Sequence, residues 1–141
     1  MNKQQTAAKN YLMKAYRIDI RISNKLEQIA LLNALATKAT SVISDMPGSP
    51  NRNIHKTEDV IVKIVDLQEE VKADMEGLVD LKKQIMDSIN QVEDPELRTL
   101  LELRYLSYLS WEQIAGEMYY GIDNIFKLHR KALDQIEVPV Q

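Results

Sequence analysis

A long segment of this chain, from Thr6 to Ser44, contains neither proline nor glycine. Its apolar residues recur at alternating steps of three and four, with one break at Lys25. That spacing places them on one face of a helix and is typical of a coiled-coil seam. The segment is therefore predicted to form one long helix with a seam of Ala15, Ile18, Ile22, Ile29, Leu32, Ala36, Ala39 and Ile43.

A second long helix is predicted after a turn-rich stretch, which we place at about residues 45–54. This stretch holds two prolines, one glycine and two asparagines, which remove backbone donors and favour turns. The second helix is expected to begin near His55 to Thr57, with Thr57 as its cap. Its seam comprises Ile64, Leu67, Val71, Leu78, Leu81, Ile85 and Val92, interrupted by Asp74 and Ser88 and widened by Ile61, Met75 and Ile89.

The charges of the two predicted helices have opposite signs. Residues 1–46 have a net charge of +4 and residues 56–92 a net charge of −4. Together with the seams, this predicts a long antiparallel helical hairpin, a coiled coil over residues 1–93, through which the protein forms a homo-oligomer. Four cations share one edge of the first predicted helix: Lys14, Arg17, Arg21 and Lys25. They can be interpreted as partners of acidic residues across the coil or as secondary phosphate contacts.

Several classes of protein are disfavoured by what the sequence contains. There is no cysteine, the two histidines (His55 and His129) are far apart, and no phosphate loop or catalytic triad is recognisable. We therefore expect no enzyme, no metal site and no cofactor. No apolar run approaches the roughly 20 residues that span a bilayer, so a cytoplasmic protein without a membrane partner is expected.

Residues 94–141 are predicted to form a small three-helix domain, which makes the whole chain all-α. Pro95 suits the first turn of a helix that runs from Glu96 to about Leu106. Ser110 and Gln113 have the spacing of a capping box, so the next helix starts at Trp111, with Ile114, Ala115 and Met118 on its inner face. Gly121 is the expected N-cap of a last helix over about 121–136, whose inner face is Ile125, Leu128, Ala132 and Ile136.

The outer face of this last helix collects the side chains that a DNA-reading helix needs. Asparagine and arginine make bidentate contacts with adenine and guanine edges, and lysine contacts phosphate. The five candidates are Asp123, Asn124, Lys127, Arg130 and Lys131. A small three-helix bundle of any function also presents a mixed-charge face. For His129 a packed or hydrogen-bonded core position is the favoured reading. The tyrosines at 105, 108, 119 and 120 have two readings, as rings that stack on bases or as half-buried residues with the hydroxyl in water, and the second is favoured.

The segment LELRYLSYLSWEQIA (101–115) followed by IFKLHRKAL (125–133) resembles the helix-turn-helix of sigma-factor region 4. YLMKAYRID (11–19), SDMPGSPN (44–51) and EDVIVKIVD (58–66) resemble the N-terminal region of the ArpU/RinA-like phage transcriptional regulators. The chain departs from the motif at three places. Tyr119 stands where the turn usually has glycine, Gly121 where the cap is usually serine or threonine, and residues 122–124 replace polar or basic ones.

This resemblance implies a sequence-specific regulator of phage or prophage late genes in a bacterial host. Its recognition helix would enter the major groove of promoter or operator DNA, with host RNA polymerase as a further partner. Two alternatives stay open. Small terminase subunits of phages also join a helix-turn-helix to long oligomerising helices, and the helical pair could instead dock on RNA polymerase or a repressor without touching DNA.

Overall fold

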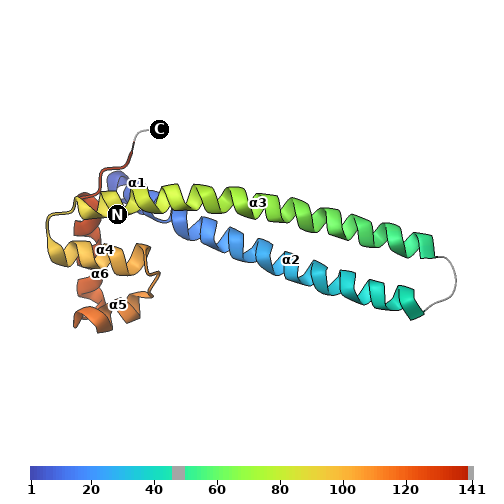
Figure 1. The fold of residues 1–141 in the computed structure, drawn as a ribbon. Coiled ribbons are helices and arrows are strands. Elements are labelled where there is room, and N and C mark those ends of the chain that lie inside the picture. Colours follow the sequence, from blue (N-terminus) through green and yellow to red (C-terminus); the bar gives the residue numbers. More distant parts are fainter. Residues whose placement is uncertain (46–49, 140–141) are drawn as a thin grey trace. The chain divides into compact units, whose positions relative to one another are not determined.

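The computed structural model describes residues 1–45 and 50–139, and it describes their side chains except in 39–45 and 50–55. The described residues form six helices and no strand, which confirms the all-α prediction (Figure 1). The helices are α1 (Lys3–Leu12), α2 (Lys14–Asp45), α3 (Pro50–Asn90), α4 (Pro95–Tyr105), α5 (Trp111–Met118) and α6 (Ile122–Asp134). They belong to two compact units, Asp19–Gly77 and Met1–Ile18 with Leu78–Gln141.

The unit Asp19–Gly77 is an antiparallel pair of helices made by parts of α2 and α3 (Figure 1). Ile22 and Ile29 of α2 are buried, and Leu32 and Ala36 are half-buried, as the predicted seam requires. On α3, the predicted seam residues that are buried in this unit are Ile64, Leu67 and Val71. Apolar burial along two facing stripes is what holds such a pair together.

The polar interruptions of the two seams pair with each other in this unit. Lys25 Nζ lies 2.7 Å from Asp74 Oδ2, and both side chains are only 19% exposed. A short ion pair that is largely removed from water stabilises the register more than an exposed pair does, because the alternative registers would leave one charge without its partner. For Lys25, the structural reading of the basic strip is therefore confirmed.

Three expectations about the hairpin are wrong. Ile61 and Met75 are each 50% exposed, so they do not widen the buried stripe. The second long helix begins at Pro50 and not near residues 55–57, which places Thr57 inside α3. Proline suits a first helical turn because its missing N–H has no partner there. Residues 46–49, which belong to the predicted loop at 45–54 and to the motif at 44–51, lie outside the described residues. The side chains of the predicted seam residues Ala39 and Ile43 lie outside them as well.

The predicted single helix over Thr6–Ser44 is interrupted at Met13, where α1 ends. Asn2 is the N-cap of α1, and a capping box joins its side chain and backbone to Gln5. Met13 has φ −77° and ψ −10°, and its N–H donates to the carbonyls of Lys9 and Tyr11. On α1, before the break, Ala8 and Leu12 are fully buried in the core of their unit.

The second unit has one apolar core, to which α1, the end of α3, α4, α5 and α6 all contribute. Tyr11 of α1 is buried there, and its hydroxyl lies 3.0 Å from Ser88 Oγ, which accounts for the second polar interruption of the α3 seam. The units thus divide the chain at residues 18 and 77, whereas the sequence predicts a boundary at residue 93. The fully buried large side chains are Leu12, Ile85, Ile89, Leu100, Leu101, Tyr105, Ile114, Ile125, Leu133 and Val92.

The connection from α3 to α4 is shaped as the sequence predicts. Asp94 has extended backbone angles and caps α4, with its Oδ1 2.9 Å from the N–H of Glu96. Pro95 is the first helical residue, one position before the predicted start. An acidic cap and Glu96 both suit the positive end of the helix dipole.

Candidate nucleic-acid interface

The first helix of the predicted helix-turn-helix is α5, and its start is as predicted. The Ser110 hydroxyl accepts from the N–H of Gln113 at 3.2 Å, and the Gln113 side chain accepts from the N–H of Ser110 at 2.9 Å. This reciprocal capping box begins the helix at Trp111. Of the predicted inner face, Ile114 is fully buried, and Ala115 and Met118 are partly buried against the same core.

The turn from α5 to α6 passes through a left-handed residue. Tyr119 ends α5 with φ 59° and ψ 40°, a conformation that favours glycine because a Cβ crowds the following carbonyl. The turn thus has the backbone conformation that favours glycine, although this chain has tyrosine there. Gly121 then has extended angles at the predicted N-cap of α6 and, lacking a side chain, makes no capping hydrogen bond.

The inner face of α6 is buried more completely than the sequence predicts. Ile125, Ala132 and Ile136 are buried and Leu128 is partly buried, as expected, and Leu133 is fully buried as well. Ile136 lies just beyond the helix, because α6 ends at Asp134 rather than at 136. These contacts hold one side of α6 against the core and leave the other side to solvent.

His129 is a core residue, as the favoured reading has it. It is 5% exposed, and its Nε2 lies 2.6 Å from the hydroxyl of Tyr105. Burial, followed by the nearby charges of Lys9, Arg104 and Arg130, lowers the pKa of His129 to about 4. Burial likewise raises the pKa of Tyr105, so the pair is neutral near pH 7. A neutral hydrogen-bonded pair keeps a polar group in the core without leaving a buried charge.

Arg104 ties α4 to the start of α5. Its guanidinium lies 4.4 Å from the ring centroid of Trp111, and its Nη1 donates to the carbonyl of Leu109 at 2.9 Å. Trp111 in turn makes edge contacts with Phe126 and His129 of α6, at centroid distances of 5.5 and 4.5 Å. These contacts pack α5 against α6 through the Trp111 ring and add α4 through Arg104.

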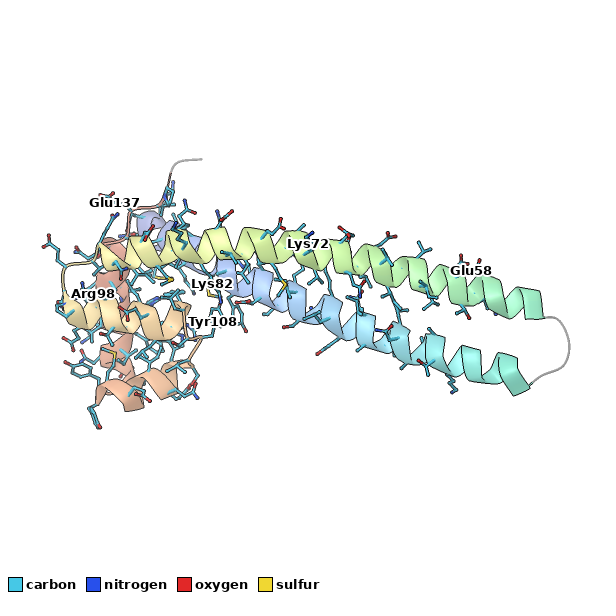
Figure 2. The ribbon with its side chains drawn as sticks, viewed as in Figure 1. Glu58, Lys72, Lys82, Arg98, Tyr108 and Glu137 are labelled. Atoms are coloured by element: carbon cyan, nitrogen blue, oxygen red, sulfur yellow. The ribbon has the colours of Figure 1, made fainter. Side chains whose placement is uncertain are left out.

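The loop between α4 and α5 holds a second left-handed tyrosine. Tyr108 has φ 59°, and its ring lies edge-on to that of Tyr16 at 5.2 Å. Lys82 of α3 places its Nζ 5.3 Å from the centroid of the same ring (Figure 2). Met13, Tyr16, Arg104 and Tyr108 line a cavity of about 100 Å³ beside this loop. Of the four tyrosines read as half-buried, Tyr108 is half-buried and Tyr105 is fully buried. Tyr120 is 39% exposed, and the reading is wrong for Tyr119, which is 94% exposed.

All five predicted DNA-contacting residues are exposed on α6. At 100° per residue they fall within one arc of the helix, so they form a single outer face, opposite the buried one. Its members are Asp123, Asn124, Lys127, Arg130 and Lys131. We call these five residues the outer face of α6; it carries three cations against one carboxylate.

The C-terminal end of α6 is held by α1, a contact that no sequence pattern predicts. Gln5 Nε2 donates to the carbonyl of Arg130 and to Asp134 Oδ1, at 3.3 and 3.0 Å. Gln4 Nε2 donates to the carbonyls of Leu133 and Ile136, at 3.3 and 3.1 Å. These hydrogen bonds tie α1 to backbone carbonyls at and just beyond the C-terminal end of α6. The spacing of Asn2 and Gln5, a capping box, was the available signal for α1.

The remaining cations of the basic strip lie on α2. Arg17 and Arg21 are exposed, whereas Lys14 is half-buried. A role for these residues as phosphate contacts stays a prediction, and Lys25 is engaged with Asp74.

Within the described parts of the chain, no group of three or more His, Asp or Glu side chains is arranged to hold a metal ion. No helix among the described residues is long and apolar enough to cross a membrane.

One comparison with known proteins gives a match. Residues 39–137, which include the end of α2 and the whole of α3, α4, α5 and α6, match the model of a family described as a protein of unknown function, DUF1492. No curated protein and no solved structure matches the chain.

Proposed function

Because the chain belongs to the DUF1492 family, which is described as having no known function, we propose a function from its geometry: sequence-specific binding of double-stranded DNA through α6. One observation carries the proposal. A capped α5, a tight turn and α6 are fixed by a buried inner side, while the outer face of α6 presents amide and cationic groups to solvent. A helix held in this way suits the major groove.

Within the outer face, we assign different tasks to different residues. Asn124 near the N-terminus of α6 reads a base edge, since residues at that end of a recognition helix reach deepest into the groove. Lys127, Arg130 and Lys131 contact phosphates or guanine, and these contacts position the helix. Asp123 accepts from a cytosine amino group, because a carboxylate in any other place would repel the backbone.

We propose that the biological role is regulation of phage or prophage late genes in a bacterial cytoplasm, in line with the resemblance to sigma region 4 and to the ArpU/RinA-like regulators. Host RNA polymerase is the further partner that this role involves. The binding chemistry above does not depend on that role.

We further propose that the hairpin unit makes the protein a homo-oligomer. Large apolar side chains on this unit are left exposed by the pairing of its two helices, and association would remove them from water. They are Ile20, Leu26, Leu31, Leu35, Ile61, Val62, Val65 and Met75. A dimer would place two α6 helices on half-sites about 10 bp apart or a multiple of that spacing.

DNA binding is tested by selecting duplexes from a random-sequence library and measuring their affinity at several salt concentrations. Lys127→Ala with Arg130→Ala should weaken binding by about fivefold or more and reduce the salt slope by about two. Lys63→Ala with Lys72→Ala, exposed lysines of α3, is the control with the same charge change. If the α6 variant binds as tightly as the control, DNA reading by this face is refuted.

Native mass spectrometry separates the regulator from a terminase-like packaging subunit. A dimer or another small oligomer agrees with the regulator, whereas a ring of many subunits would argue for packaging. If no duplex is enriched and RNA polymerase or a repressor binds directly to the purified chain, the protein is an interaction module without DNA contact.

A further inference from the structure

Tyr119 combines two features that both disfavour a tyrosine at its position. Its φ of 59° is in the left-handed region, which a side chain with a Cβ enters only at a cost in free energy. Its side chain is 94% exposed, so the ring contributes almost nothing to the core that might offset this cost. Glycine or asparagine would meet the backbone requirement with less strain.

The other aromatic residues near α5 and α6 behave differently. Trp111 packs against Phe126 and His129, and Tyr105 is buried and bonded to His129. Tyr120, the next residue along the chain, is 39% exposed, and a hydrogen bond with Glu96 raises the pKa of its hydroxyl. Tyr119 is therefore distinct among these aromatic side chains in standing almost fully in solvent.

The position of Tyr119 places it next to the outer face of α6. It precedes the first helical residue, Ile122, by three positions, and Asp123 and Asn124 follow directly. Ile122 is itself 36% exposed, so apolar surface borders the polar groups at the N-terminal end of α6. This is the end of a recognition helix that reaches the bases, and the turn before it lies at the edge of the groove.

We infer that Tyr119 is a DNA-binding residue, displayed by the strained turn so that its ring packs on a deoxyribose or a thymine methyl group and its hydroxyl donates to a phosphate oxygen. Tyrosine serves both kinds of contact, since its ring is apolar and its hydroxyl is a neutral donor. The contact involves no charged group of the protein. Tyr119 therefore increases the affinity for DNA next to the negatively charged Asp123 without an additional cation. The inference rests on the proposed function, that α6 binds DNA.

The experiment compares three variants on one probe, the duplex that wild-type protein enriches from a random library. Tyr119→Gly removes ring and hydroxyl and relieves the backbone, so the variant should fold at least as stably as wild type. Its affinity should nevertheless fall by about fivefold or more, the loss that truncating a tyrosine anchor in an interface typically causes. The salt slope should stay unchanged because no counterion release is lost.

Two further variants assign the contact and control for it. Tyr119→Phe keeps the ring, so an affinity near that of wild type identifies a ring contact, and a loss equal to that of Tyr119→Gly identifies the hydroxyl. Tyr16→Ala removes a tyrosine of α2 that is 38% exposed and lies outside the turn, and it should leave affinity unchanged.

The outcomes distinguish this inference from the function on which it rests. If Tyr119→Gly binds within twofold of wild type while Lys127→Ala with Arg130→Ala weakens binding, the role of Tyr119 is refuted and DNA binding by α6 stands. If wild-type protein enriches no duplex, DNA binding itself is refuted, and the inference falls with it.

Discussion

Acidification should destabilise this protein through one residue, His129. The ring is buried and neutral in the folded chain, with a pKa of about 4, whereas an unfolded chain gives histidine its ordinary value of 6.5. Between these two pH values the unfolded chain binds about one proton more than the folded chain. The free energy of unfolding therefore falls as pH drops from 6.5 to 4, by about 1.4 kcal/mol per pH unit and about 3 kcal/mol in all.

The charged groups around the imidazole ring of His129 disfavour its protonated form further. Lys9 of α1, Arg104 of α4 and Arg130 of α6 all carry positive charge, and each lowers the pKa of His129 in addition to burial. Tyr105 contributes only a neutral hydroxyl, whose own pKa is raised. Protonation of the ring in the folded chain is therefore disfavoured until the pH falls to about 4.

The assay is urea unfolding at half-unit steps from pH 7.5 to 4.5, compared between wild type and His129→Gln. Glutamine keeps a hydrogen-bonding group for Tyr105 and does not titrate, so the difference in slope isolates His129 from the carboxylates. His55→Gln, which leaves His129 as the only histidine, should retain the wild-type slope and allows its ring pKa to be measured by NMR. A ring pKa of 6 or above, or equal slopes for wild type and His129→Gln, would refute this reasoning.

Four further predictions concern the helix ends and the hairpin. Ser110→Ala should lower the free energy of unfolding by about 1 kcal/mol through loss of the α5 cap, measured by urea unfolding, and Ser110→Asp should largely preserve it. Tyr119→Gly should raise the midpoint of thermal unfolding, through about 1 kcal/mol of relieved backbone strain; a lower midpoint would contradict the left-handed turn. A double-mutant cycle of Lys25→Met and Asp74→Leu should show favourable coupling of about 1 kcal/mol or more, with the double variant more stable than either single one. Gln5→Ala should speed amide hydrogen exchange at the C-terminal end of α6 more than in α5.

Local signals predicted much of the fold. The apolar period indicated both long helices, and the capping box of Ser110 and Gln113 located the start of α5 to the residue. These features depend on groups within a few positions of one another, so the sequence records them directly. The five outer-face residues of α6 could be chosen in the same way, because helical periodicity separates them from Ile125 and Ala132.

The features that sequence reasoning missed depend on contacts between distant segments. No proline or glycine marks the break at Met13, and α1 separates from α2 where Ala8 and Leu12 join the core of α4, α5 and α6. The hydrogen bonds from Gln4 and Gln5 to the end of α6 join residues more than 120 positions apart, so no periodic pattern in the sequence indicates them. The start of α3 also differs from the prediction, because Pro50 begins the helix within the proline-containing stretch that suggests a loop.

The sequence by itself determined which stripes are apolar, where α4 and α5 begin, and which side chains α6 presents outward, since short-range periodicity and capping decide these. Only the tertiary structure decided that Tyr119 keeps a left-handed backbone, that His129 is buried as a neutral base, and that α1 holds the end of α6. The physical reason is that backbone strain, desolvation and long-range hydrogen bonds are properties of the packed chain. They arise only when segments that are distant in the sequence come into contact.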